Sequence, residues 1–139
     1  DMQFIRYMNL FNEVTRVSAK HCFSYNNAIV FVVPRKYVQR AIGKDNENLK
    51  RFSSILEKRI RVVPEPTSMK DLQYFVSVLI SPVKFEKIEI QQNGDEKEAV
   101  ISTSGMENKA MLIGRGRVRE KEMKEILEQY FGIKGIRIV

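Results

Sequence analysis

An internal repeat constrains the fold of this chain more strongly than any other feature of the sequence. The segment 28–57 aligns without a gap with the segment 99–128, at an offset of 71 residues (99 minus 28). The alignment places Ile42-Gly43-Lys44 opposite Ile113-Gly114-Arg115 and pairs Ile29 with Val100. Because solenoid repeats have periods of roughly 20–50 residues, this longer period indicates two small domains.

The second copy is longer than the first. After the aligned segment, Ile60-Arg61-Val62-Val63 corresponds to Ile136-Arg137-Ile138-Val139 at an offset of 76 (136 minus 60). We predict two domains, 1–66 and 67–139. The segment Pro64-Glu65-Pro66-Thr67 is the expected linker, and its two prolines favour a stiff, extended chain.

The composition of the 139-residue chain is that of a soluble globular protein, with 43% hydrophobic and 29% charged residues. The sequence has neither an apolar run of the ~18–20 residues needed to cross a bilayer nor the order of a signal peptide at its N-terminus. We therefore expect a cytoplasmic protein. The single cysteine, Cys22, and the single histidine leave no internal disulfide and no zinc ligand set, so no metal or other cofactor is expected.

The charge of the chain favours an anionic partner, because the net charge is +7 and the pI is near 9.6. The excess is uneven. Residues 1–66 contain twelve Lys or Arg and six Asp or Glu, a net +6, whereas residues 67–139 contain twelve and eleven, a net +1. The first copy therefore carries most of the positive charge.

The hydrophobic pattern of the first copy predicts a helix, two strands, two helices and a last strand. Apolar residues from Phe4 to Val17 recur every three or four positions, which is typical of an amphipathic helix. Strands are expected at 21–25 and 28–33, joined by a tight turn at Asn26-Asn27, because asparagine tolerates positive φ. The second strand is apolar throughout and should be central and covered on both faces. The remaining elements are helices at 37–42 and 47–57, the latter capped by Asn46, and a strand at 59–63.

The second copy repeats this order. Ser68 and Asp71 resemble a capping box at the start of a helix that continues to Ile80. Each copy therefore reads α-β-β-α-α-β, with a glycine turn between its last two helices, and the predicted fold class is α+β, an α/β sandwich. The other elements of this copy are strands at 85–91 and 99–103 around a turn at Asn93-Gly94, helices at 106–113 and 118–130, and a strand at 135–139.

The glycine turn in each copy suits a phosphate. A helix that begins directly after a turn directs free N–H groups and the positive end of its dipole outward. Glycine also lets a ligand approach the backbone closely, because it has no Cβ. The basic residues that follow each turn point to the same chemistry.

The order strand, helix, Ile-Gly turn, helix, strand around Gly43 and Gly114 resembles the KH domain, an RNA-binding module. A helix and hairpin precede this core, so the similarity is to the type II form, which implies helices packed on one face of a three-stranded mixed sheet. Two such domains in tandem resemble the KH pair of the NusA family of transcription factors, and most of all its archaeal NusA-like members.

The resemblance implies a function. The loop of a KH domain clamps the backbone of about four nucleotides, and an apolar groove beside it accepts unpaired bases. The expected partner is single-stranded, nascent RNA, and the expected process is transcription elongation, termination or antitermination. RNA polymerase is a second implied partner, and we expect a monomer that does not bind membranes.

The expected RNA-binding residues are the turn residues and the basic residues beside them. They are Arg40, Ile42, Gly43, Lys44, Asn46, Lys50 and Arg51 in the first copy, and Ile113, Gly114, Arg115, Gly116, Arg117, Arg119 and Lys121 in the second. Ile29 and Val100 are expected to join the two turn isoleucines as walls of the groove.

The two loops differ from the family pattern and from each other. Neither has the second glycine at the fourth position of the loop, and Asp45 puts a like charge beside a phosphate bound at the first. The run 115–121 contains four basic residues and only Glu120. We therefore expect the second loop to bind RNA more strongly than the first.

Other interpretations of these residues stay open. Glycine is frequent at ordinary helix C-caps, and the basic run could be a solvated helix face. Tyr25, Tyr37 and Tyr74 could stack on bases, although core packing or surface placement is favoured. His21 and Cys22 are adjacent in a strand and point to opposite faces, which argues against a catalytic pair. No pair of carboxylates stands out as an acid/base couple, so an enzyme is not expected.

Two other functions are compatible with the sequence. A KH-fold protein could serve as a protein-interaction scaffold on RNA polymerase, or as an RNA adaptor in ribosome assembly. Binding that weakens steeply with salt would favour an RNA ligand, because phosphate contacts release counterions.

Overall fold

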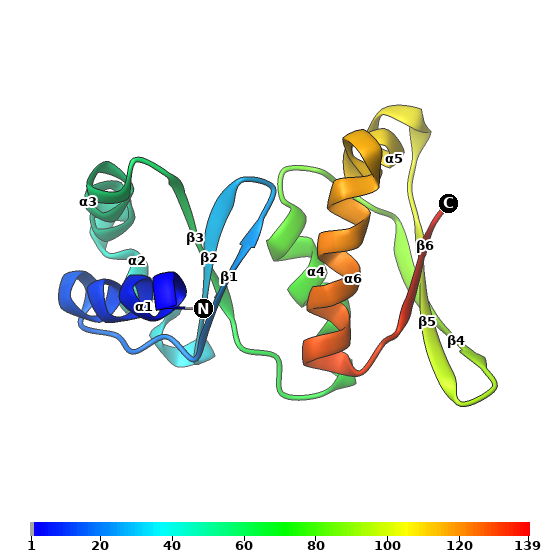
Figure 1. The fold of residues 1–139 in the computed structure, drawn as a ribbon, viewed down its shortest axis with the longest axis horizontal. Coiled ribbons are helices and arrows are strands. Elements are labelled where there is room, and N and C mark those ends of the chain that lie inside the picture. Colours follow the sequence, from blue (N-terminus) through cyan, green and yellow to red (C-terminus); the bar gives the residue numbers. More distant parts are fainter. Residues whose placement is uncertain (1) are drawn as a thin grey trace. The chain divides into compact units, whose positions relative to one another are not determined.

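The computed structural model describes residues 2–139. The chain divides into two compact units, Asp1–Glu65 and Pro66–Val139. Figure 1 shows that the helices of each unit lie to one side of that unit's own sheet. Within the described residues, every helix is too short or too polar to span a bilayer.

The first unit has the predicted α-β-β-α-α-β order. Its sheet has the strand order β1-β2-β3, in which β1 and β2 are antiparallel and β2 and β3 are parallel. All six residues of the middle strand β2 are buried, as its apolar sequence predicts. The elements are α1 (Met2–Thr15), β1 (His21–Tyr25), β2 (Ala28–Val33), the 3-10 turn η1 (Arg35–Tyr37), α2 (Val38–Ile42), the 3-10 turn η2 (Lys44–Asn46), α3 (Glu47–Leu56) and β3 (Arg59–Pro64).

The second unit repeats the order and the mixed sheet. Its strand order is β4-β5-β6, with β4 antiparallel and β6 parallel to β5. The chain is thus a mixed α+β protein with two three-stranded mixed sheets. The elements are the 3-10 turn η3 (Met69–Asp71), α4 (Leu72–Ile80), β4 (Lys87–Asn93), β5 (Glu96–Ser102), α5 (Gly105–Ile113), the 3-10 turn η4 (Arg115–Arg117), α6 (Val118–Phe131) and β6 (Gly135–Ile138).

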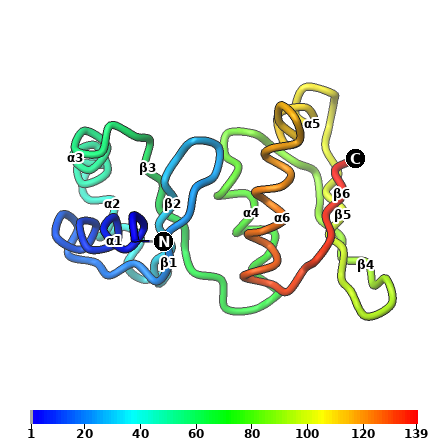
Figure 2. The backbone as a smooth tube through the Cα atoms, in the orientation of Figure 1, coloured from blue at the N-terminus to red at the C-terminus, as the bar shows by residue number. Residues whose placement is uncertain are grey.

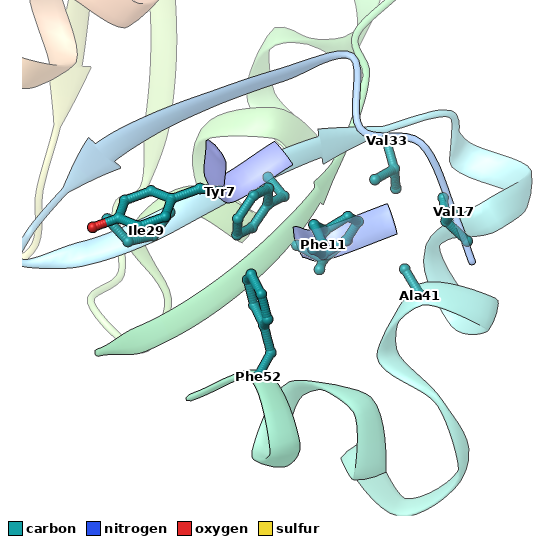
Figure 3. Close-up of a cluster of buried hydrophobic side chains, with 9 residues drawn as sticks. Tyr7, Phe11, Val17, Ile29, Val33, Ala41 and Phe52 are labelled. Carbon is teal, nitrogen blue, oxygen red and sulfur yellow. The ribbon is translucent and has the colours of Figure 1, made fainter. Parts of the chain in front are cut away.

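Three phenylalanines hold the core of the first unit together (Figure 3). The ring centroids of Phe11 and Phe31 are 4.3 Å apart with an interplanar angle of 15°, so α1 stacks directly on β2. Phe52 of α3 meets Phe11 edge-on at 5.8 Å and Phe31 at 5.3 Å. Offset and edge-to-face pairs of this kind add to the stabilisation that burial alone provides.

The tight turn between β1 and β2 forms where the sequence predicts it. Asn26 has φ 52° and Asn27 has φ 59°, and the flanking residues Tyr25 and Ala28 form the last pair of the hairpin ladder. Two consecutive left-handed residues match the twist of a two-residue hairpin, which explains the asparagine pair.

The predicted helix caps are only partly correct. Asn46 directly precedes α3, but it has left-handed φ and ψ of 60° and 24° and its side chain makes no cap hydrogen bond. An N-cap side chain reaches the helix N–H groups from an extended backbone, so a left-handed Asn46 cannot do so. Ser68 accepts from the Lys70 N–H at 3.3 Å, as an N-cap does, and the Asp71 carboxylate accepts from the N–H of Thr67 at 2.8 Å.

Several predicted element boundaries are wrong, among them those of β4, which spans Lys87–Asn93 rather than 85–91. The sequence predicts Pro64 in the linker, but Pro64 lies in β3, where its register partner is Val33. Strand β5 begins at Glu96, three residues before the predicted start at Ala99. The early residues of β5 pair with the polar end of β4 in the yellow-green hairpin of Figure 2. Hydrophobicity does not reveal a strand segment whose side chains are exposed.

The gap-free alignment of the two copies fails in the strands. In the first sheet the partner of Ile29 is Ile60, and in the second sheet the partner of Ile136 is Ala99. If Ile60 corresponds to Ile136, then Ile29 corresponds to Ala99 rather than to Val100.

Side-chain contacts agree with this slip of one residue. Ile29 belongs to the hydrophobic core of the first unit. Val100 instead pairs with Arg137, whose side chain reaches Gln91 and lies 3.7 Å from Glu98. Since neighbouring strand residues point to opposite faces, a shift of one residue exchanges the two faces of the strand.

Candidate nucleic-acid interface

The loops that begin at Gly43 and Gly114 have the same backbone conformation. Gly43 has φ 81° and ψ 169°, and Gly114 has φ 76° and ψ 167°, a region essentially restricted to glycine. A Cβ on Gly43 would lie 3.0 Å from the Asn48 side chain, and one on Gly114 would lie 2.7 Å from Cγ of Arg119. Both glycines are therefore required by the chain itself, because the following helix packs back against the loop.

The third and fourth residues of both loops are left-handed. Asp45 and Asn46 have φ values of 53° and 60°, and Gly116 and Arg117 have 63° and 64°. Asparagine and aspartate tolerate this region, and glycine adopts it freely. Gly116 thus occupies the third loop position, where φ is positive in both copies. The fourth position, where the KH pattern has glycine, is left-handed in both loops although neither residue there is glycine.

The hydrogen bonds of the loop combine a helix end with a tight turn. The Gly43 N–H donates to the Gln39 carbonyl at 2.9 Å, and the Asn46 N–H donates to the Gly43 carbonyl at 3.2 Å. The loop at Gly114 repeats both bonds, at 2.9 and 3.1 Å. Each glycine is therefore a helix C-cap, as the simpler interpretation of the sequence held. These turn bonds do not use the N–H groups of Lys44 and Asp45.

The first loop lies beside a hollow of about 640 Å³. Lys44, Lys50 and Arg51, all predicted site residues, line this hollow together with Asp45 and Glu47. None of the three basic side chains forms a hydrogen bond or ion pair with residues 2–139. The structure thus brings three available cations together, with two carboxylates among them.

The second loop has fewer available cations than its sequence suggests. Arg117 lies 2.9 Å from Glu120, and Arg119 lies 2.7 Å from Glu122. The Arg119 side chain is only 15% exposed. The sequence places only one acid within the run 115–121, but helix geometry puts a glutamate three residues after each of these two arginines, so both arginines are paired.

Arg115 and Lys121 are the remaining cations of the second loop. Both are exposed, and neither makes a hydrogen bond or ion pair among the described residues. The residue after Arg115 is Gly116, where a Cβ would have no atom within 4 Å, whereas the corresponding residue of the first loop is the acidic Asp45. The second loop therefore has fewer free cations but no acid within its four loop residues.

Arg40 does not belong to the hollow beside the first loop. It lines a different hollow, of about 500 Å³, together with Arg16, Lys20 and Tyr37. Only the Arg40 backbone carbonyl is tied to the loop region, because it accepts from the Asn48 amide at 3.2 Å. This amide was not among the predicted site residues, and its contact with Gly43 could not be read from sequence.

The apolar walls of the predicted groove are mostly core residues. Ile42 and Ile113 are half-buried, and Ile42 packs against the core of the first unit. Ile29 and Val100 are buried, at 5% and 8% exposure, so neither can present a wall to a ligand. That expectation is corrected: the apolar strand residues support the fold rather than the site.

The other singled-out side chains divide into core and surface. Tyr25 is buried, whereas Tyr37 and Tyr74 are exposed. Burial raises the pKa of the Cys22 thiol to about 12, so the thiol is protonated near neutral pH. Among residues 2–139, no group of His, Cys, Asp and Glu is arranged to hold a metal ion.

Comparison with solved structures gives a relative of nearly equal length. The crystal structure of APE1850 superposes with a TM-score of 0.72 and 30% sequence identity, covering 100% of this chain and 99% of APE1850. The chain belongs to the same family as APE1850. No family model matches the sequence.

Comparison with curated proteins finds relatives of this chain that carry a functional name. The chain is 24% identical to the "probable transcription termination protein NusA" of Methanococcus vannielii, over 97% of this chain and 76% of the relative. Proteins of the same name from Methanocaldococcus jannaschii and Halococcus morrhuae are each 22% identical, covering 97% and 96% of this chain and 72% and 93% of their own lengths. The chain is thus similar to NusA proteins along nearly its whole length.

Proposed function

We propose that the chain is a NusA-type factor that binds single-stranded RNA through two type II KH domains and acts in transcription termination. The observation that carries this proposal is the duplicated loop. In both units the loop begins with a glycine in the same conformation, and its third and fourth residues are left-handed. A duplicated backbone of this kind, placed before a helix and beside free cations, suits two phosphate clamps on one strand.

Several observations support RNA as the ligand. The net charge is +7, and Lys44, Lys50, Arg51, Arg115 and Lys121 beside the loops are not neutralised by ion pairs with residues 2–139. The N–H groups of the second and third loop residues are not used by the turn bonds. The relatives named as NusA supply the process, and the role is that of a binding factor without catalysis.

The second loop is proposed to bind RNA more strongly, and of the two reasons for this expectation only the acidic charge beside the first loop remains. Its advantage is no longer an excess of cations, since two of its arginines are paired with glutamates. The first loop instead has a disadvantage, because Asp45 and Glu47 line the same hollow as its three cations. Like charges beside a phosphate reduce its binding.

The test is the affinity for a random single-stranded RNA pool as a function of salt. We would compare Lys44→Ala and Arg115→Ala with Lys58→Ala, after the end of α3, and with Lys97→Ala, near the β4–β5 hairpin, each of which removes an exposed lysine from the same unit. Each loop variant should reduce the slope of log affinity against log salt by about 0.7, with the greater loss of affinity for Arg115→Ala, whereas the controls should leave both unchanged.

Two results would contradict the proposal in different ways. Equal losses of RNA affinity in the loop variants and the controls would show that the loops do not clamp phosphates. Absence of RNA binding at low salt, together with retention on RNA polymerase, would favour a protein-interaction scaffold instead.

A further inference from the structure

A second basic hollow lies in the first unit, and it shares no lining residue with the hollow beside the glycine loop. It has a volume of about 500 Å³ and is lined by the residues that follow α1 and by the start of the η1–α2 segment. Three cations contribute to it, namely Arg16, Lys20 and Arg40. Of these, only Arg40 was expected at a binding site, and the structure separates it from Lys44, Lys50 and Arg51.

The electrostatics of this hollow are one-sided. None of the side chains of Arg16, Lys20 and Arg40 forms a hydrogen bond or ion pair with residues 2–139, and no carboxylate is among the lining residues. The hollow beside the glycine loop differs in containing Asp45 and Glu47. Three uncompensated positive charges around one concavity attract an anion more strongly than the same charges spread over a surface.

A hydroxyl donor is also in place. The Asn12 amide donates to the Ser18 Oγ at 2.6 Å, so the Ser18 oxygen already accepts a hydrogen bond. A hydroxyl has one proton of its own to donate, and Ser18 lines the hollow. Tyr37, which is exposed at the same place, has its ring covered by the Lys36 ammonium 5.1 Å from the ring centroid. Lys36 therefore adds a fourth positive charge beside the hollow.

The backbone that carries these side chains is well anchored. Val17, which lies between Arg16 and Ser18 in the sequence, is buried. Its N–H donates to the Thr15 hydroxyl at 3.1 Å. The Lys20 N–H donates to the Val32 carbonyl at 2.7 Å, which fixes this segment to β2. Figure 3 shows Val17 near Ala41, the neighbour of Arg40, at one end of the same core. The cations therefore project from backbone whose position is set before any ligand binds, which lowers the ordering cost of binding.

We propose that this hollow, formed by Arg16, Ser18, Lys20 and Arg40, is a phosphate-binding site separate from the glycine loops. Its ligand is a phosphate group, either on a single-stranded RNA that also occupies the loops or on a free di- or triphosphate. Guanidinium and ammonium groups with a hydroxyl donor are the groups that recognise phosphate oxygens in proteins. The site does not depend on whether the loops bind RNA.

The test is an amide NMR titration of the whole chain with inorganic pyrophosphate and, separately, with single-stranded RNA. The signals of Val17, Ser18 and Lys20 should shift with pyrophosphate at concentrations that leave the signal of Lys58, at the other end of the first unit's sheet, unmoved. The double variant Arg16→Gln/Lys20→Gln should weaken this response about threefold to tenfold, because exposed charge pairs are individually modest. Lys58→Ala, which removes one exposed cation elsewhere in the unit, should leave it unchanged.

The outcomes separate the two phosphate sources and the two proposals. A response to both probes assigns the hollow to an RNA strand, and a response to pyrophosphate alone assigns it to a free phosphate compound. The response of the hollow to pyrophosphate should be the same in Lys44→Ala and Arg115→Ala, so failure of the loops to bind RNA leaves this site intact. If neither probe shifts these amides, or if the double variant responds like Lys58→Ala, there is no phosphate site. If the double variant fails to fold, Arg40→Gln in α2 can be tested instead. It should weaken the same amide shifts with pyrophosphate.

Discussion

Gly114 and Arg119 are packed against each other so closely that no side chain fits between them. A Cβ on Gly114 would lie 2.9 Å from the Arg119 backbone nitrogen and 2.7 Å from its Cγ. The guanidinium of the same arginine is held 2.7 Å from the Glu122 carboxylate. The loop and the first turn of α6 therefore form one packed unit, and the loop conformation depends on α6 as much as on its own sequence.

Replacing Gly114 by alanine should destabilise the second unit severely. The glycine-only backbone region and the steric clash with Arg119 together should cost about 3 kcal/mol or more. Gly116→Ala is the matched control, because Gly116 has φ 63° but no atom within 4 Å of an added Cβ. It should cost only about 1 kcal/mol. Amide hydrogen exchange in α6 would measure both, and equal losses would show that packing against Arg119 is unimportant.

Asp45→Gly should strengthen RNA binding by the first loop. The change removes a carboxylate from the hollow that contains Lys44 and Arg51, and it gives the left-handed third position the residue that the second loop has there. We expect affinity to rise about threefold to fivefold at low salt, with little change in stability. The reciprocal change, Gly116→Asp, should weaken binding by a similar factor. If both changes act in the same direction, charge at this position does not control affinity.

Phe11→Ala should unfold much of the first unit. Phe11 is fully buried and contacts both Phe31 and Phe52, so the change removes the centre of the aromatic cluster. We expect a loss of about 3–5 kcal/mol in the free energy of unfolding. Ile5→Ala, on the exposed face of the same helix, should change it by less than about 0.5 kcal/mol. Urea denaturation followed by circular dichroism compares the two; similar midpoints would contradict the described core.

The stability of the first unit should fall at alkaline pH partly because of Cys22. Burial raises the pKa of this thiol from its ordinary value of 9.0 to about 12, so the folded state keeps its proton after the unfolded state has lost it. The unfolded state then binds fewer protons, and stability present below pH 9 is lost as pH rises towards 12. Cys22→Ala should show a smaller fall over this window. The measurement is the unfolding midpoint of both proteins from pH 8 to pH 11, and parallel curves would exclude a contribution from the thiol.

The element order and the paired loops could be predicted because they depend on local rules. Asparagine at both positions of the β1–β2 turn, the fully apolar β2 and the glycine before each last helix each specify their structure within a few residues. The predicted cation cluster of Lys44, Lys50 and Arg51 also formed, since one loop and one short helix bring these residues together.

The failures involve side-chain geometry as well as relations across the fold. The ion pairs of Arg117 and Arg119 depend on which rotamers the helix surface favours, and the burial of Ile29 and Val100 depends on sheet register. Arg40 precedes Gly43 by only three residues, yet the short α2 turns its side chain towards the segment after α1. Closeness in sequence to Gly43 therefore does not reveal which of the two hollows the Arg40 side chain lines.

The one-residue slip between the strands gives a rule for recombining the two halves of the molecule. The loops 43–46 and 114–117 have closely similar dihedral angles at their first, third and fourth residues, so each could be transplanted into the other unit together with the helix that follows it. Consider a hybrid protein that joins the first unit to the second within β2 at the offset of 71 residues that aligns the loops. Its strand would exchange inward-facing and outward-facing side chains. Crossover points for such hybrids should therefore lie after the strand, where the two copies come back into step.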